Sequence, residues 1–135
     1  MLLIENMKKE KRWTLLRHSG DPKDLKGIHF DLLLEEEDVC RTWRLIEMPV
    51  LNGPEVQATI APIHQLKWLE IEKAKISGDR GWAERINSGF YKGDLPRLIE
   101  LPFCIQLHSE QLIAWLKMEN GFCRIQSCFE KVFDS

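Results

Sequence analysis

Turn residues divide this chain into short apolar runs, and that division constrains the fold more than any other feature. The clearest case is the turn Asn120-Gly121, which separates the apolar runs 112–118 and 122–129. Asparagine and glycine both adopt the positive φ angles that a two-residue hairpin turn requires. The sequence therefore predicts a β-hairpin across this turn, with Trp115 of its first strand packed in the core.

The same pattern predicts strands along the rest of the chain. Runs rich in β-branched and aromatic residues, each bounded by turn residues, are typical of strands. These runs cover residues 13–18, 29–35, 39–46, 56–60 and 82–87. Because the strand signals far outnumber helical ones, we expect a mostly β fold, a small single-domain β-barrel with little helix.

Three stretches give a less regular pattern. Residues 63–76 fit both helical and strand spacing, and we favour a turn around His64 followed by a strand. Ser88-Gly89 predicts a turn that ends the preceding strand. Residues 98–107 are apolar but contain Pro102, which suits an edge strand or a kink.

The composition fits one soluble domain. The chain has 135 residues, of which 44% are hydrophobic and 30% charged, and its formal net charge is -2. This charge lacks the strongly basic signature of a nonspecific nucleic-acid coat protein, so any nucleic-acid contact would be a local patch. We expect residues 13–135 to form the single domain and residues 1–12, which end in a basic cluster, to form a flexible N-terminal arm.

The cysteines and the lack of a long apolar segment bear on the compartment. No Cys-x-x-Cys pair occurs among Cys40, Cys104, Cys123 and Cys128, which argues against a zinc knuckle or a thioredoxin-type motif. No signal peptide is recognisable, and no stretch reaches the length of a membrane span. We therefore expect a cytoplasmic protein without membrane contacts, whose cysteines are free thiols used in packing.

The predicted strand around His29 carries the clearest chemistry. Successive side chains of a strand point to opposite faces, so His29, Asp31 and Leu33 share one face. His18 ends the preceding predicted strand, and antiparallel pairing of the two strands would bring it beside His29. A histidine and an aspartate on one face form two arms of a metal site, or half of an acid–base pair.

Two histidines and one carboxylate suit a particular class of metal ion. Imidazole and carboxylate ligands together favour first-row divalent metals such as manganese, iron or zinc. Three protein ligands also leave positions open for water and substrate, as a catalytic metal requires. Spacing alone is a weak signal, since a His-x-Asp pair on a strand is more often a hydrogen-bonded surface pair.

Five segments, taken in order, form a recognisable pattern. They are Arg17-His18, His29-Phe30-Asp31-Leu32-Leu33-Leu34-Glu35, Arg41-Thr42-Trp43, His64-Gln65-Leu66-Lys67-Trp68 and the glycine-containing residues 76–89. This pattern resembles the 3'-phosphoesterase domain found at the N-terminus of many bacterial DNA ligase D proteins, and the chain looks like a standalone short relative of it. The resemblance covers roughly residues 13–90.

The resemblance implies a compact β-barrel with a manganese site, although zinc would also suit the ligands. It implies removal of a 3'-terminal phosphate or ribonucleotide from DNA or RNA–DNA ends, alongside separate repair ligases and polymerases. His18, His29 and Asp31 would be the metal ligands of the catalytic site. His64 would bind the scissile phosphate or act as the acid–base group, since the unperturbed pKa of histidine lies near neutrality.

The chain departs from the family pattern where phosphate would bind. The family's arginine after the aspartate is Leu33 here, and its tyrosine is Trp68, which donates through the indole N–H but cannot exchange a proton. Trp68 remains a candidate phosphate-binding residue, and Arg44, Arg80 or Arg85 would supply the missing positive charge from other strands. The loop before the second motif is also longer than in the ligase-fused domains.

These departures leave two other functions open. One is a catalytically weak or inactive module of the same fold that binds nucleic-acid ends or a protein partner. The other is a metal phosphoesterase for a small phosphorylated molecule, which the modest net charge also allows. Among the remaining residues, Trp13, Trp43 and Trp82 are expected in the core, and His108 matches no motif.

Overall fold

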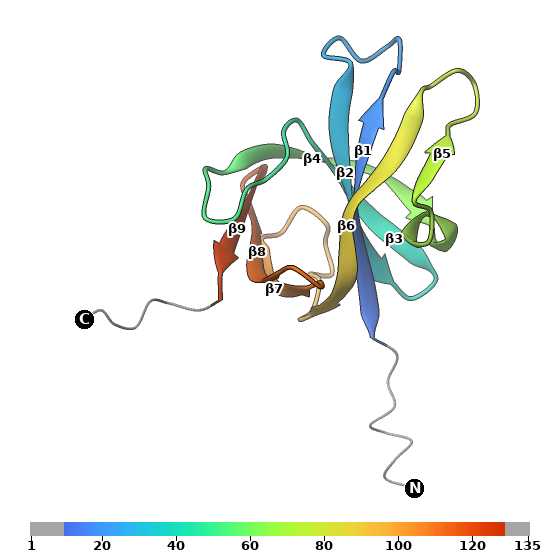
Figure 1. The fold of residues 1–135 in the computed structure, drawn as a ribbon. Coiled ribbons are helices and arrows are strands. Elements are labelled where there is room, and N and C mark those ends of the chain that lie inside the picture. Colours follow the sequence, from blue (N-terminus) through green and yellow to red (C-terminus); the bar gives the residue numbers. More distant parts are fainter. Residues whose placement is uncertain (1–9, 129–135) are drawn as a thin grey trace, which may run out of the picture.

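The computed structural model describes residues 10–128, which form one antiparallel sheet of nine strands and one short helix (Figure 1). The strands are β1 (Lys11–Ser19), β2 (Ile28–Glu36), β3 (Val39–Leu45), β4 (Val56–Gln65), β5 (Lys73–Lys75), β6 (Trp82–Lys92), β7 (Phe103–His108), β8 (Ile113–Glu119) and β9 (Phe122–Ser127). The 3-10 helix η1 (Leu66–Leu69) lies between β4 and β5. The predicted mostly β fold with little helix is confirmed.

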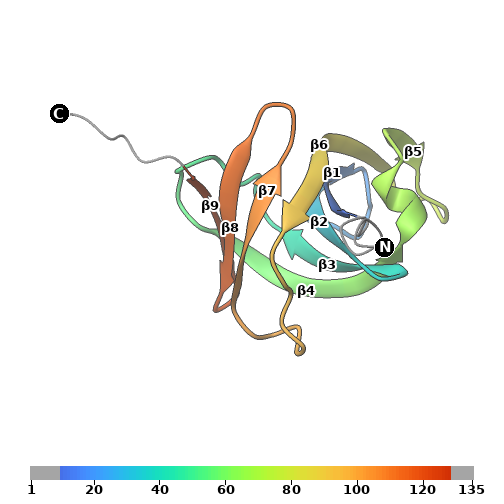
Figure 2. The same ribbon diagram turned by 90° about the horizontal axis from the view of Figure 1, so that it is seen from below.

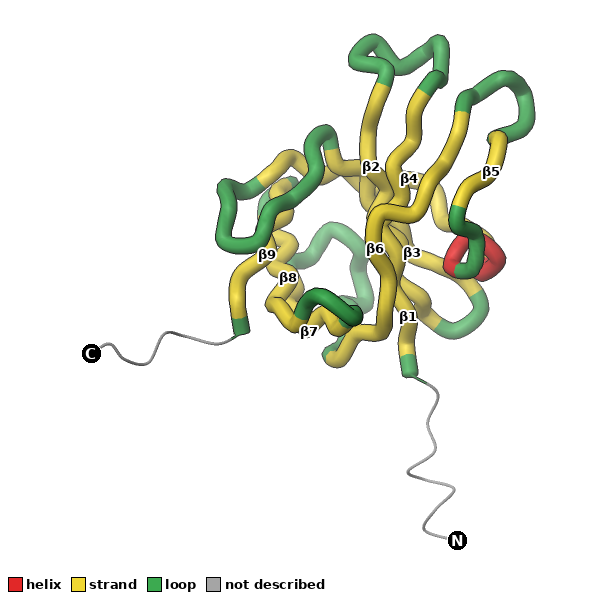
Figure 3. Tube along the Cα trace, viewed as in Figure 1, coloured by secondary structure: helices red, strands yellow, loops and turns green. Residues whose placement is uncertain are grey.

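Eight of the strands close into a ring. The strand order is β1-β2-β3-β4-β9-β8-β7-β6, and pairing between β1 and β6 closes the ring (Figure 2). β5 pairs with β6 outside the ring, next to the turn of η1 (Figure 3). The architecture is therefore barrel-like, as predicted. Within the described part of the chain, no helix has the length and apolar character needed to cross a membrane.

The sheet is buried on both faces at β1, β2 and β3. All eight ring strands contribute apolar side chains to the main core inside the ring, including Trp13, Leu34 and Ile105. On the outer face, Leu33 belongs to a second, smaller cluster with Leu69 of η1. Because η1 covers this outer face, polar residues on it lie in a sheltered environment rather than in open solvent.

Strand β6 is longer than the sequence predicted. It continues to Lys92, so the turn predicted at Ser88-Gly89 is wrong. A Cβ atom at Gly89 would collide with the backbone carbonyl oxygen of His108. The glycine therefore marks a close approach of two backbones within the sheet, which is the other common reason for glycine in a strand.

The stretch 63–76 also differs from its prediction. β4 does not stop at residue 60 but stays paired with β3 as far as Gln65, so His64 lies in a strand rather than at a turn. The pattern was mixed because the stretch contains the end of a strand, a helical turn and the short β5. Further on, Pro102 directly precedes β7, which pairs with both β6 and β8, so the predicted edge strand is wrong.

Two tryptophans lie on the surface, contrary to the core prediction. Trp115 is 40% exposed because its neighbours Ala114 and Leu116 take the core-facing positions of β8. Trp82 is 45% exposed on β6, where the amine of Lys73 lies 5.6 Å from its ring centroid. The predicted burial of the other two tryptophans, those on β1 and β3, is confirmed.

The cysteines divide into two groups. Cys40 and Cys123 are buried as predicted, and burial raises the pKa of their thiols to about 11 and about 12. Cys104 is exposed, so the predicted packing role is wrong for this residue, and Cys128 is half-buried.

The sheet includes the end of the predicted N-terminal arm. Lys11 and Arg12 belong to β1, so the arm prediction is wrong for these two residues. Residues 1–9 of that prediction, and Phe129 at the end of the last predicted run, lie outside the described residues.

Replacing Gly89 by alanine should lower the free energy of unfolding, because the new methyl group would collide with a backbone carbonyl that cannot move aside freely. Overpacking of this kind typically costs about 1–3 kcal/mol. Urea unfolding followed by circular dichroism measures the change. Ser88→Ala is the matched control, since it adds no atoms at the neighbouring position, and equal stability of the two variants would contradict the prediction.

Candidate metal centre

The β1–β2 pairing places His18 directly opposite His29, as the sequence analysis expected. Asp31 lies two residues further along β2 on the same face. All three side chains are buried, with exposures of 8%, 4% and 7%. Two adjacent strands of one sheet therefore bring together the three predicted ligand residues.

The ligand atoms of the three residues converge on one point. His18 Nδ1 lies 3.0 Å from His29 Nε2, and His29 Nε2 lies 3.5 Å from Asp31 Oδ2. One ligand atom from each residue lies within 4.8 Å of the others, which is compact enough to hold a metal ion. Imidazole and carboxylate ligands in this number suit a first-row divalent ion.

The outward-facing nitrogens of both rings have defined hydrogen-bond partners. His18 Nε2 donates to the backbone carbonyl oxygen of Arg80 at 2.6 Å, and His29 Nδ1 donates to Asp24 Oδ2 at 2.9 Å. Because a carbonyl and a carboxylate only accept hydrogen bonds, these nitrogens carry the ring protons in the neutral histidines. His18 Nδ1 and His29 Nε2 therefore present lone pairs to each other and to Asp31.

Three electron-rich atoms at these distances require a cation between them. A proton on His29 is one such cation. Burial lowers the pKa of His29, but its hydrogen bonds to Asp31 and Asp24 outweigh burial. The pKa of His29 is therefore raised above its ordinary value. A divalent metal ion is the other. Asp31 Oδ1 favours the metal, because it is buried and accepts no hydrogen bond from the described residues. The donor set and this unsatisfied oxygen fit a metal site whose outer nitrogens are oriented as metal-ligating histidines usually are.

One pocket of about 350 Å³ opens beside this cluster, and we call it the metal pocket. Six of the predicted site residues line it. They are His18, Asp31, Arg44, His64, Trp68 and Arg80. They come from β1, β2, β3, β4, η1 and the loop before β6, so the fold gathers in one place residues that lie up to 62 positions apart in the sequence, from His18 to Arg80.

His64 has a fixed orientation in the metal pocket. Its Nδ1 lies 3.0 Å from the carbonyl oxygen of Pro62 and 3.0 Å from the hydroxyl of Thr42. The carbonyl can only accept, so Nδ1 carries the proton and Nε2 holds a lone pair in the neutral ring. The indole ring of Trp68 packs edge-on at 6.2 Å between centroids. A histidine held in this tautomer can take up a proton at Nε2 and release it again.

The candidate arginines differ in their availability. Arg44 is the most available, since its side chain is half-exposed and its Nε lies 3.9 Å from Asp31 Oδ1. The guanidinium of Arg80 is hydrogen-bonded to Ser77 within its own loop. Arg85 donates to the Leu69 carbonyl of η1 and does not line the metal pocket.

Leu33, where the resemblance to ligase D phosphoesterase domains leads one to expect an arginine, is completely buried. It packs with Leu16, Cys40 and Ala83 in the cluster under η1, so its side chain supports the floor of the site and lines neither the pocket nor the cluster of ligands. Any positive charge for a phosphate must therefore come from another strand, and Arg44 of β3, which pairs with Asp31, is the residue placed to supply it.

Sequence reasoning missed Asp24, Thr42 and the Arg80 carbonyl, which orient the three histidines. Asp24 lies in a loop, where no periodicity relates it to His29. One indirect signal in the sequence indicated that the loop of Arg80 lies close to β1, namely the glycine that follows Arg80. A Cβ at Gly81 would collide with the Ser19 carbonyl oxygen, and only glycine allows this loop to approach β1 so closely.

A scan of the chain against protein-family models finds no match, and a search of curated proteins also finds none.

Replacing His29 by alanine should abolish tight binding of Mn²⁺ and Zn²⁺, because it removes the ligand atom between the other two. Loss of an outer-shell partner typically lowers metal affinity about 10–100-fold, and loss of a ligand should exceed that. Isothermal titration calorimetry measures the affinity, and metal should raise the Tm of the wild-type protein but not that of His29→Ala.

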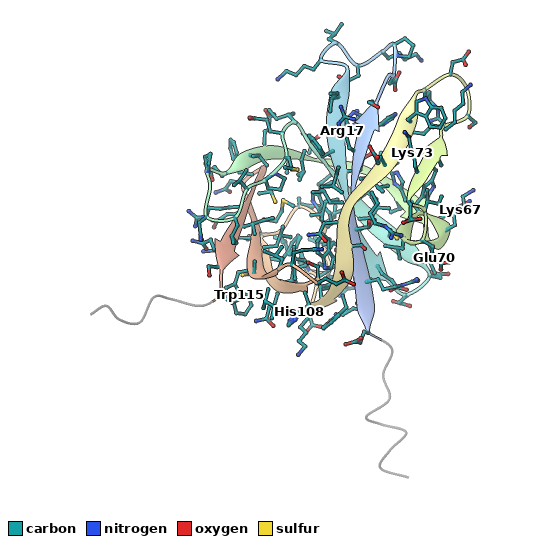
Figure 4. The ribbon with its side chains drawn as sticks, viewed as in Figure 1. Arg17, Lys67, Glu70, Lys73, His108 and Trp115 are labelled. Carbon is teal, nitrogen blue, oxygen red and sulfur yellow. The ribbon has the colours of Figure 1, made fainter. Side chains whose placement is uncertain are left out.

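His108→Ala is the control, since His108 lies on β7 at the other end of the ring and stacks on Phe90 (Figure 4). A wild-type protein that binds neither metal, or equal losses in both variants, would exclude the metal site.

Asp24→Asn should weaken metal binding about 10–100-fold, because the neutral amide no longer polarises the Nδ1–H of His29 or fixes its tautomer. Asp21→Asn in the same loop is the matched control, as its side chain accepts a hydrogen bond from the Lys23 N–H instead. The same calorimetric titration compares the two. Equal affinities in the two variants would show that Asp24 does not orient the ligand.

Proposed function

We propose that this protein is a metal-dependent phosphoesterase that removes a 3'-phosphate or a 3'-ribonucleotide from DNA ends. The observation that carries the proposal is the shared pocket, in which the ligand cluster, an acid–base histidine and an arginine line one cavity of about 350 Å³. The ordered resemblance of residues 13–90 to ligase D phosphoesterase domains supplies the substrate class.

His18, His29 and Asp31 would hold the ion, and manganese suits this mixed nitrogen and oxygen donor set, with zinc as the alternative. When bound, a divalent ion supplies Lewis-acid polarisation of phosphoryl oxygens. The burial of the ligand cluster strengthens its electrostatic effect, because little water screens the charges.

His64 would be the general acid–base group. Its hydrogen bonds to Pro62 and Thr42 hold Nδ1 as the donor, so that Nε2 takes a proton from an attacking water or, once protonated, gives one to the leaving oxygen. Arg44 would hold the non-bridging phosphate oxygens in place of the family's arginine. Its half-exposed guanidinium beside Asp31 is free of bidentate ion pairs among the described residues.

A second candidate function is binding of nucleic-acid ends without turnover. The buried leucine at position 33 favours it, since a bidentate arginine clamp on phosphate is missing there. In either case the partners are DNA or RNA–DNA 3' ends, with separate polymerase and ligase proteins acting on the product. We place the protein in the cytoplasm, where its free cysteines would stay reduced.

The test is manganese-dependent release of phosphate or a ribonucleoside from a primer–template with a modified 3' end. We expect turnover by the wild-type protein, none by His29→Ala, and a kcat lowered about 10²–10⁴-fold by His64→Ala, as for loss of a general acid–base group. His108→Ala should retain full activity. End binding without turnover under any divalent metal would favour the second candidate, and turnover of small phosphorylated molecules alone would exclude both.

A further inference from the structure

A second pocket lies on the other side of the ligand cluster. It measures about 290 Å³ and is lined by the loop between β1 and β2, the first two residues of β2, Arg44 of β3 and Ile46 just after β3. We call it the loop pocket. Residues 20–27 of that loop extend beyond the ring at the end where the ligand cluster lies (Figure 1).

The two pockets share a wall. Arg44 lines both of them, His29 lines the loop pocket, and Asp31 lines the metal pocket. The imidazole of His29 presents Nε2 to the ligand cluster and Nδ1 to Asp24 of the loop. The two pockets therefore adjoin at Arg44, whose half-exposed side chain borders both.

The loop pocket combines positive charge with apolar surface. Lys23, Lys26 and Arg44 contribute cations, and among the described residues the two lysine amines form no ion pair. Asp21 and Asp24 also line the pocket, so three cations face two carboxylates and the lining keeps an excess of one positive charge. The carboxylates accept hydrogen bonds close by: Asp21 accepts the Lys23 N–H, and Asp24 accepts the Lys26 N–H and the His29 ring proton.

The apolar part comes from three residues. Ile28 and Ile46 line the pocket, and Leu25 at the tip of the loop is fully exposed. Isolated exposed leucines are common, but this one borders a cavity with cations on its rim. Cations beside an apolar surface suit a nucleotide, whose phosphate contacts the cations while the sugar and base cover the apolar side chains.

We propose that the loop pocket binds the nucleotide that precedes the 3'-terminal group of a nucleic-acid strand. This inference rests on the proposed function and extends it: the substrate is a chain end rather than a free mononucleotide. Each pocket is only as large as a small-ligand site, so a mononucleotide fills one pocket, whereas a strand end spans both.

The test measures the kinetics of the wild-type protein and of the double variant Lys23→Gln/Lys26→Gln on two substrates. One substrate is a 3'-phosphorylated primer–template and the other is thymidine 3'-monophosphate. We expect the KM for the primer to rise several-fold, with an unchanged kcat/KM for the mononucleotide. Loss of two phosphate contacts should also reduce the slope of log Kd against log salt by roughly 1.4–1.8 for the primer. Lys73→Gln/Lys75→Gln on β5 is the matched control, because it removes the same charge from residues that line neither pocket.

Failure of this inference is distinguishable from failure of the proposed function. Primer turnover that the loop variant leaves unchanged would overturn the loop pocket and keep the phosphoesterase. If the wild-type protein releases no phosphate, fluorescence anisotropy of the primer gives the Kd instead. Weaker primer binding by the loop variant than by the control variant would then keep the loop pocket, and equal binding would overturn it.

Discussion

The register between β1 and β2 determines whether this protein has a site at all. His18 faces His29 only in the observed pairing, and a slip of one residue would turn every side chain of one strand to the opposite face. Burial on both faces opposes such a slip, since leucines alternate into both cores. An ion pair between Arg12 and Glu35, with Nε and Oε1 3.0 Å apart, joins the same two strands at the end away from the site.

The cover over the outer face of the sheet shields the ligand cluster from water. On an open sheet the two histidines and the aspartate would be hydrated, and water would satisfy their lone pairs. Here η1 packs against the face below the cluster, and the loop after β5 reaches the cluster through the Arg80 carbonyl. Buried acceptors without donors are costly, so the fold itself creates a demand for a cation at this point.

The strands were predictable because alternation and turn residues are local signals, and the β1–β2 pairing followed from two strands joined by one loop. The errors have physical causes that are not local. Gly89 looks like a turn residue in the sequence, but it is required by the approach of the backbone near His108. Trp115 looks like core because it is aromatic, yet its position in the alternation of β8 faces outward. The orienting groups of the site, such as Asp24, come from loops and have no periodicity.

The loop between β1 and β2 links the ligand cluster to the second pocket. One carboxylate, that of Asp24, accepts both the Lys26 backbone N–H and the ring proton of His29. The conformation that shapes the loop pocket is therefore the same conformation that orients His29, a candidate metal ligand. A loop that served only to connect β1 and β2 would not need a side chain hydrogen-bonded to this histidine. The loop is thus part of the candidate site, although it contributes none of the three candidate ligand atoms.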